Sequence, residues 1–356
     1  MSRHTPCPLC GGFEDEFLLE IEAHEVRRCV VCGLLTTSPE LSHEQIASLY
    51  EEQYYSGTSA RRFQIGLAEG VMKVFRRWRA MKVRRLLKGA PGQRVLDVGC
   101  GRGYMLRALE DCGYEVYGTQ LSSAAVRFAR ERLGLMNVFQ GNLQEAQYPD
   151  NWFDFVSMYH VLEHLPDPVE QLREVYRVLK PGSLLYVEVP NSGSLPARWL
   201  KASWLAWDLP RHRFHYDANT LSRMGQLCGF VPARLLFFSL EYSPATLLLS
   251  LLSAMFRDRH MLFHCLTQGS AQAGEGHLAR DAKVASQGFV AGLLAAPVLL
   301  ASVLLGWRKT GDTIGIYFRK QPAAPSREKK LSGAAMAGFP EDYRVAQPAV
   351  VKGSCS

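Results

Sequence analysis

The first ten residues lack the apolar run that forms the centre of a secretory signal peptide. They are polar and include proline and cysteine, so we expect a cytoplasmic protein. Thiols stay reduced in that compartment. The nine cysteines of the chain therefore need an explanation other than disulfide bonds.

Acidic residues are nearly absent from residues 61–88, which hold ten lysines and arginines but one acid, Glu69. The formal net charge of all 356 residues is only +7, so the rest of the chain is close to neutral. The basicity is a local patch, of the kind that meets anionic lipid or the phosphates of RNA. Few aromatic residues for base stacking are interleaved with these cations, which weighs against nucleic acid as the partner.

Charge is wholly absent from residues 288–307, a run long enough to cross a bilayer. A second apolar run, 245–256, is too short to cross alone. Both runs lie between two expected strands, so an insert at about 245–307 must leave the fold and return. A peripheral or re-entrant hairpin at the cytoplasmic face of a membrane satisfies this, with Pro297 suited to a bend. The alternatives are a pair of buried helices that cover the active site, or a dimer interface.

The sequence contains two Cys-x-x-Cys pairs separated by eighteen residues: Cys7 with Cys10, and Cys29 with Cys32. Four thiolates at this spacing fit the tetrahedral preference of Zn²⁺, and a segment so poor in core residues depends on the metal to fold. We therefore expect residues 1–38 to form a zinc ribbon around a structural zinc ion. A redox dithiol is the alternative.

From Arg94 onward, short apolar segments alternate with amphipathic ones. The apolar segments predict strands at 94–98, 115–118, 136–140, 153–159, 183–189, 233–241 and 313–319. Helices are predicted at 103–112, 122–133 and 168–179. Alternation of this kind is typical of a Rossmann-like, doubly wound α/β sheet, mostly parallel and here with an antiparallel last strand.

The main domain is thus expected at 91–320, with further segments on either side. Residues 39–90 predict a helical extension, in which a capping box at Ser42 begins one helix and a second, basic helix runs from about 63 to 88. One face of the basic helix carries apolar residues at helical spacing: Val71, Val74, Phe75, Trp78 and Met81. Residues 321–356 have the composition of a disordered tail.

The segment Val95-Leu-Asp-Val-Gly-Cys-Gly-Arg-Gly103 carries the main functional signal. An apolar strand runs into a Gly-x-Gly-x-Gly turn, and Asp97 precedes the first glycine by two residues. Glycines there let a ligand approach the backbone at the carboxyl edge of the sheet, although such a turn alone also occurs in dinucleotide sites. The whole arrangement resembles motif I of the class I S-adenosylmethionine-dependent methyltransferases of the small-molecule type. The resemblance extends over about 39–320.

The resemblance implies S-adenosylmethionine as the cofactor and a set of residues around it. The methionine portion would be held by Asp97, Gly99, Gly101 and Gly103. Gln120 would bond the ribose, and Asn142 and Leu143 lie at the position that recognises adenine. The backbone near Tyr159 and His160 would also meet the cofactor. Gln120 stands where the family usually has an acid. Its amide still bonds a hydroxyl, and the missing acid argues against NAD.

Two groups of residues are candidates for the reaction itself. Glu163 and His164 follow the fourth strand, and the resemblance implies a divalent metal or the substrate as their partner. Capping of the next helix is the alternative. His212 and His215 lie in Pro-Arg-His-Arg-Phe-His, which is similar to a segment of small-molecule members. Either histidine suits a base that removes an acceptor's hydroxyl proton, oriented by Asp208; structural burial is the alternative.

The sequence therefore predicts a methyltransferase that acts on an oxygen of a small-molecule, glycan or lipid-linked acceptor. Membrane contact through 245–307 and the basic helix at 61–88 is expected to accompany it. Three alternatives stay open: an RNA methyltransferase that uses the ribbon and the basic helix, a sugar C-methyltransferase, and a non-catalytic zinc-ribbon binding module. The intact glycine turn argues against the last.

Overall fold

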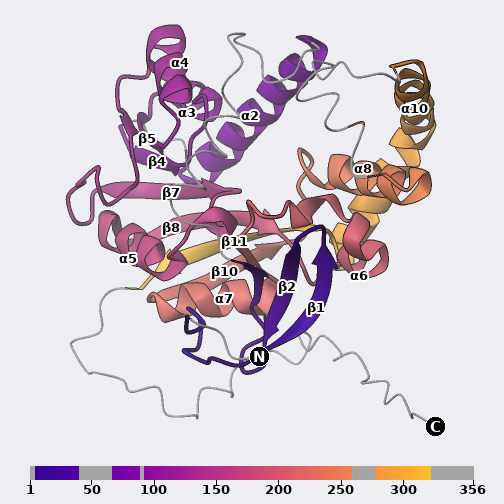
Figure 1. Ribbon diagram of the computed structural model, residues 1–356. Helices are drawn as coiled ribbons and strands as arrows, with labels where there is room; N and C mark the ends of the chain where they lie inside the picture. Colours follow the sequence, from indigo (N-terminus) through magenta and orange to yellow (C-terminus); the bar gives the residue numbers. More distant parts are fainter. Residues whose placement is uncertain (1–4, 40–65, 89–91, 259–261, 263–276, 322–356) are drawn as a thin grey trace. The chain divides into compact units, whose positions relative to one another are not determined.

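The computed structural model describes residues 5–39, 66–88, 92–258, 262 and 277–321 (Figure 1). The helix predicted to begin at Ser42 and all but the first residue of the predicted tail lie outside the described residues.

A seven-stranded sheet lies at the centre of the main domain (Figure 1). Its strands are, in spatial order, β10 (Phe230–Leu236), β11 (Thr313–Lys320), β8 (Leu179–Pro190), β7 (Phe153–Tyr159), β4 (Arg94–Val98), β5 (Glu115–Gln120) and β6 (Val138–Gln140). Strands β8 to β6 pair in parallel, and β11 enters antiparallel between β8 and β10. The prediction of a Rossmann-like sheet with an antiparallel last strand is confirmed. Because parallel strands end at one edge, the segments that follow β4, β5 and β7 meet there.

Helices cover both faces of this sheet (Figure 1). On one face lie α2 (Gly66–Leu86), α3 (Tyr104–Glu110) and α4 (Ser123–Leu133), and on the other α5 (Pro168–Val178) and α7 (Ala218–Leu227). Side chains fix where three helices begin, because Ser122, Asp167 and Asp217 each accept a hydrogen bond from a backbone N–H three residues later. The three helices predicted between the strands are present, with small shifts at their ends.

Alternation along the strands divides the core into two layers. Val95 and Phe155 pack with α2, α3 and α4, whereas Leu96 and Val156 pack with α5 and α7. All four side chains are fully buried. Burial of such a side chain is worth about 1.5–3 kcal/mol. A slip of one residue would exchange the two layers, so this burial holds the register.

The basic helix α2 turns only part of its predicted apolar face inward. Phe75 and Trp78 are half-buried and line a pocket, whereas Val74 and Met81 are 63% and 46% exposed. Arg79, Ala80 and Val83 are buried. Arg79 faces the sheet because it forms an ion pair there, at 2.6 Å from Glu241. Hydrophobic periodicity does not register a buried ion pair, which is why the sequence pattern placed this arginine in the outer basic patch.

The N-terminal segment forms a second sheet, which the main domain completes. β1 (Asp15–Ile21), β2 (His24–Cys29) and β3 (Leu35–Ser38) pair antiparallel, and β3 pairs with β9 (Phe214–His215) of the main domain. Cys7 and Leu34 belong to the same buried cluster as Phe214 and Leu221. The ribbon and the main domain therefore share both a sheet and a core.

The apolar insert forms α8 (Ser243–Phe256) and α10 (His277–Trp307), which pack against each other. Lys283–Trp307 of α10 is long and apolar enough to cross a membrane, and only 11% of its most apolar window is buried. Phe289, Leu300 and Trp307 are largely exposed. The alternative that two buried helices cover the site is thus wrong for α10. Pro297 does not end the helix, which continues through it.

The packing of α7 on β11 predicts the effect of one added methyl group. A Cβ at Gly225 would lie 2.3 Å from the ring of Phe318, which is itself buried. We expect Gly225→Ala to destabilise the protein by about 1–3 kcal/mol through overpacking, even though alanine is the better helix former by about 0.8–1 kcal/mol. The check is the urea midpoint of unfolding.

Gly70→Ala is the matched control, because a Cβ at Gly70 of α2 meets nothing within 4 Å. It should stabilise by about 0.5–1 kcal/mol. Equal stabilisation by both substitutions would contradict the described contact between α7 and β11.

Candidate functional site

The turn between β4 and α3 forms an open backbone surface at the carboxyl edge of the sheet. Gly99, Gly101 and Gly103 have φ values of 70°, 56° and 79°, a region that other residues avoid. A Cβ at Gly99 would lie 2.5 Å from Val161, and one at Gly103 would lie 2.6 Å from Leu135, so close packing requires both glycines. A Cβ at Gly101 would meet nothing within 4 Å. This is where a ligand has room to approach the backbone.

Asp97 lies directly before this turn and is buried. The hydroxyl of Ser157 on β7 donates to its Oδ1 at 2.7 Å. Burial raises the pKa of Asp97 to about 6, although Ser157 and, from further away, Arg79 and Arg76 oppose the rise. A carboxylate that is costly to ionise gains from a positively charged ligand group, such as the amino group of a methionine moiety.

The residues implied for ribose and adenine follow β5 and β6. Gln120 ends β5, and its Oε1 accepts a hydrogen bond from the backbone N–H of Ser122 at 3.2 Å. Oδ1 of Asn142 accepts from the backbone N–H of Glu145 at 2.8 Å, so Asn142 shapes its own turn whether or not it meets adenine. The side chain of Leu143 is fully buried in the core, which leaves only its backbone for a cofactor.

Tyr159 ends β7 and His160 follows it, beside a buried network of charges. The guanidinium of Arg79 lies 3.9 Å over the ring of Tyr159. It also lies 2.6 Å from Glu241 and 3.6 Å from Glu188. Glu188 lies 3.5 Å from Nε2 of His160. The partners come from α2, β7, β8 and the segment after β10, so no single stretch of sequence contains the network. Its one local signal is an acid within the apolar strand β8.

Ion pairing outweighs burial in this network. Burial would lower the pKa of His160, but Tyr242 and the adjacent carboxylates raise it well above its ordinary range. Burial would likewise raise the pKa of Glu188, yet His160 and Arg79 lower it to about 2. His160 is therefore a cation held between two carboxylates, Glu188 and Glu163.

A small pocket opens beside this network. Aromatic rings and charged side chains line it, among them Phe75, Trp78, Lys82, Tyr159, Glu188 and Glu241. Burial lowers the pKa of Lys82 to about 8. Tyr159, one of the implied cofactor contacts, thus also lines this pocket.

Glu163, His164 and His212 converge on a second point, with their ligand atoms within 4.8 Å of one another. Glu163 is 1% exposed, and its Oε1 accepts from Nδ1 of His160 at 3.2 Å. Its Oε2 is buried and has no hydrogen-bond partner within the described part of the chain. A buried oxygen in that state is costly. Two imidazoles and a carboxylate could hold a divalent cation or a polar acceptor group.

Backbone carbonyls determine which nitrogen carries the proton in two of the histidines. Nδ1 of His164 lies 3.1 Å from the carbonyl of Arg211, and Nδ1 of His212 lies 2.9 Å from that of Ala206. A carbonyl only accepts, so both Nδ1 atoms carry a proton, and in a neutral ring Nε2 has the lone pair. Burial and the neighbouring His212 lower the pKa of His164 to about 4, which keeps it neutral. Nε2 is then the basic atom of each ring.

His215 lies beside this group, with its ring centre 6.3 Å from that of His212. Burial lowers the pKa of His215 well below its ordinary value. Its Nε2 lies 3.0 Å from Oγ1 of Thr37, on the ribbon strand β3. Asp208, expected to orient one of these histidines, lies 3.5 Å from Nε2 of His212 but accepts its hydrogen bonds from Arg211.

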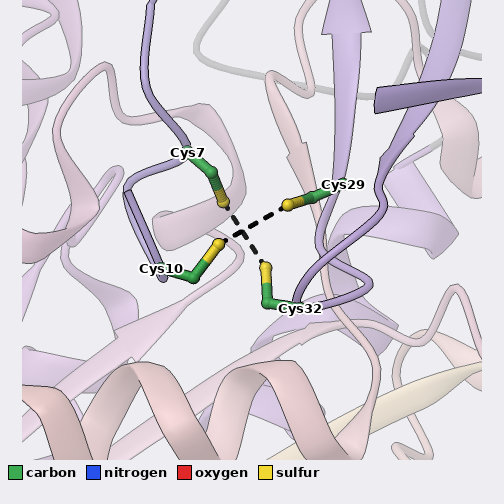
Figure 2. Close-up of side chains that lie close together, drawn as sticks. All are labelled: Cys7, Cys10, Cys29 and Cys32. Carbon is green, nitrogen blue, oxygen red and sulfur yellow. Dashed lines mark hydrogen bonds between the residues drawn. The ribbon is translucent and has the colours of Figure 1, made fainter. Parts of the chain in front are cut away.

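The four ribbon cysteines point toward a common centre (Figure 2). Sγ of Cys7 lies 3.5 Å from that of Cys32, and Sγ of Cys10 lies 3.5 Å from that of Cys29. A tetrahedral zinc with Zn–S distances of about 2.3 Å places its sulfurs about 3.8 Å apart. The hydrogen bond between Cys7 and Cys32 lowers the pKa of Cys7 to about 5 and raises that of Cys32, so without a metal these two thiols share one negative charge. The arrangement fits a structural zinc ion.

Residues 72–234 match a family described as a methyltransferase domain. These residues are just under half of the chain, and the match supports a class I S-adenosylmethionine-dependent methyltransferase domain there. The chain is 33% identical over 150 residues to a Mycolicibacterium smegmatis protein named "Probable S-adenosylmethionine-dependent methyltransferase", which covers 41% of this chain and 55% of that one. It is 39% identical over 123 residues to a demethylmenaquinone methyltransferase of Listeria welshimeri, covering 32% of this chain and 51% of that one.

The chain thus spans about half the length of the curated relatives it matches. Among solved structures it is similar to an S-adenosylmethionine-dependent methyltransferase of Archaeoglobus fulgidus, with 21% identity and a TM-score of 0.42 over 69% of this chain and 94% of that one.

The environment of Asp97 predicts how cofactor binding to the methyltransferase domain depends on pH. The pKa of Asp97 is about 6 without a ligand, and a cationic amino group favours its ionised form. Affinity for S-adenosylmethionine should therefore be constant above pH 6 and fall below it, by up to about tenfold per pH unit. Calorimetric titrations between pH 4.5 and 8 measure this.

Asp97→Asn is the control, since it has no charge to lose. It should bind weakly at every pH and show no break near pH 6. An unchanged affinity of the original protein across this range would rule out an ionised Asp97 as a cofactor contact.

Proposed function

We propose that the protein transfers the methyl group of S-adenosylmethionine to an oxygen of a small, membrane-soluble or lipid-linked acceptor. The observation that carries the proposal is the open backbone at Gly101 next to the buried Asp97. Both lie at the sheet edge where the aromatic pocket also opens. The family match over residues 72–234 supports the cofactor.

The cofactor supplies an electrophilic methyl group on a sulfonium. The chain's own residues would then do three things. Asp97 and the glycine turn hold the methionine portion, and the backbone after β5 and β6 holds the nucleoside. The pocket beside Tyr159 excludes water from the acceptor. We assign the role of base that takes the hydroxyl proton of the acceptor to Nε2 of His212 or His164, because Nδ1 of each ring already donates to a backbone carbonyl.

Two observations support an apolar acceptor. The Listeria relatives are named demethylmenaquinone methyltransferases, which points to a quinone-like compound. The long helix α10 also exposes Phe289, Leu293, Leu300 and Trp307 to solvent, and apolar patches of this size are rare on soluble monomers. We propose that α10 lies against the membrane from which the acceptor is taken.

The RNA alternative has less support. Of the cations in the basic helix, Arg76 and Arg79 form ion pairs with Glu241 inside the domain. They are therefore not directed outward toward phosphates.

The first test combines a cofactor-site variant with a transfer assay. Gly101→Val fills the open space and strains a φ of 56°. It should abolish S-adenosylmethionine binding while leaving the circular dichroism spectrum unchanged. The original protein should transfer labelled methyl groups to a membrane-lipid extract, and not to RNA.

The control is Gly134→Ala. Gly134 also has a positive φ and open space but caps α4 away from the turn. It should lower stability and leave affinity for the cofactor unchanged. Cofactor binding by Gly101→Val at the original affinity would show that the turn is not the site. Transfer to RNA alone or to glycans alone would show that the acceptor belongs to that class and is not a membrane-soluble or lipid-linked compound.

The exposed face of α10 generates a membrane prediction. The full-length protein should sediment with anionic liposomes, and added salt should weaken this without abolishing it, because each cation near the surface adds only about 1 kcal/mol. Changing Phe289, Leu293 and Leu300 to Ser should release the protein. A protein that ignores liposomes at low salt would show that this face has another partner.

A further inference from the structure

The ribbon strand β3 and the histidine segment of the methyltransferase domain are joined residue by residue. Leu35 pairs with His215 and Thr36 with Phe214 across the two strands. The backbone N–H of Thr37 donates to the carbonyl of Arg213 at 3.0 Å. The segment that carries the proposed bases is thus an edge strand of the ribbon's own sheet.

Thr37 makes two side-chain contacts with this segment. Its Oγ1 lies 2.5 Å from the carbonyl oxygen of His212 and 3.0 Å from Nε2 of His215. Two oxygens at 2.5 Å need a proton between them, and a carbonyl has none to give. The only hydroxyl proton of Thr37 is therefore directed to His212. The contact with His215 then requires Nε2–H of the imidazole to donate.

This settles the tautomer of His215. Its Nε2 carries the proton, and the lone pair lies on Nδ1, the reverse of His164 and His212. A tautomer determines which atom can act as a base, so a ribbon residue selects the basic atom of a histidine that the main domain contributes to the same sheet.

Apolar contacts hold the same segment from the side. Val26 and Leu35 of the ribbon form a buried cluster with Trp204 and Trp207. The ring of Trp207 meets that of His215 edge-on, with centres 5.0 Å apart. The ribbon therefore packs with Trp207, whose ring contacts that of His215.

We infer that the zinc ribbon is a working part of the active site, and that Thr37 is a positioning residue that fixes the tautomer of His215 and the course of the 212–215 segment. The inference rests on the proposed function for its catalytic meaning and on geometry alone for the coupling. The ribbon depends on its metal to fold, so loss of zinc should release β9 while the glycine turn keeps its shape.

The test uses the full-length, zinc-loaded protein with nitrogen-15 in its histidines. Long-range proton–nitrogen spectra distinguish a protonated ring nitrogen from one with a lone pair, and His215→Gln assigns the signal by its loss. We expect a pure Nε2–H pattern for His215. Thr37→Val keeps the branched shape and should give a mixture of tautomers, whereas Thr37→Ser should restore the original pattern.

Thr36→Val is the matched control, since it makes the same change on the next residue of the strand and should leave the pattern unchanged. In the transfer assay, Thr37→Val should lower kcat by about 10- to 100-fold, because the 212–215 segment loses the bond to the carbonyl of His212 and holds the proposed base His212 less well. The KM for S-adenosylmethionine should not move, because the cofactor site lies at the other sheet.

Removal of zinc by a chelator needs no substitution and decides the matter if Thr37→Val fails to fold. With zinc loss confirmed by elemental analysis, the signal of His215 should shift as in Thr37→Val, while calorimetry still detects cofactor binding. An unchanged His215 signal after zinc loss would overturn the coupling. A protein that transfers no methyl group but shows the expected tautomers would overturn the proposed function alone.

Discussion

The convergence of parallel strands at one edge is the constraint on which the site depends. Strands β4, β5 and β7 run in the same direction, so Asp97, Gln120 and Tyr159 arrive at one line although they are far apart in the sequence. Two buried layers hold those strands in register. The glycine turn then leaves the backbone open at the point where the strands end.

Charge is concentrated in the interior next to this edge. Arg79, His160, Glu163, Glu188 and Glu241 are all largely or fully buried, and each has a partner of opposite charge. Such a network adds little net free energy to the stability of a fold, because the loss of hydration opposes the Coulomb attraction. Its presence beside an aromatic pocket is easier to explain by what it binds and positions than by stability. It also ties α2, which precedes the domain's first strand, to the wall of the pocket.

The N-terminal ribbon is not a separate unit, because it shares a sheet and a buried core with the methyltransferase domain. Its four thiols converge as a structural zinc site requires (Figure 2), yet its third strand is completed by residues of the methyltransferase domain. A metal bound by these thiols would therefore also support the segment that carries His212 and His215. The contacts that link the ribbon to this segment are the backbone hydrogen bonds between β3 and β9 and the hydroxyl of Thr37.

Local patterns in the sequence determined the elements and one motif. Strand and helix periodicity, the Gly-x-Gly-x-Gly turn after an apolar strand and the paired cysteines each express a short-range rule, so they can be read without knowledge of the fold. The sequence also shows that Gln120 stands where the family usually has an acid. What periodicity could not show is which distant residues meet. The sequence pattern assigned Arg79 to an outer basic patch, whereas in the structure this arginine is directed inward by its ion pair with Glu241. Likewise, the docking of β3 on β9, the grouping of Glu163 with His212 and the tautomers of the histidines follow from contacts between residues far apart in the chain. Tertiary structure alone decided these, because a hydrogen bond or an ion pair depends on distance in space and leaves no period in the sequence.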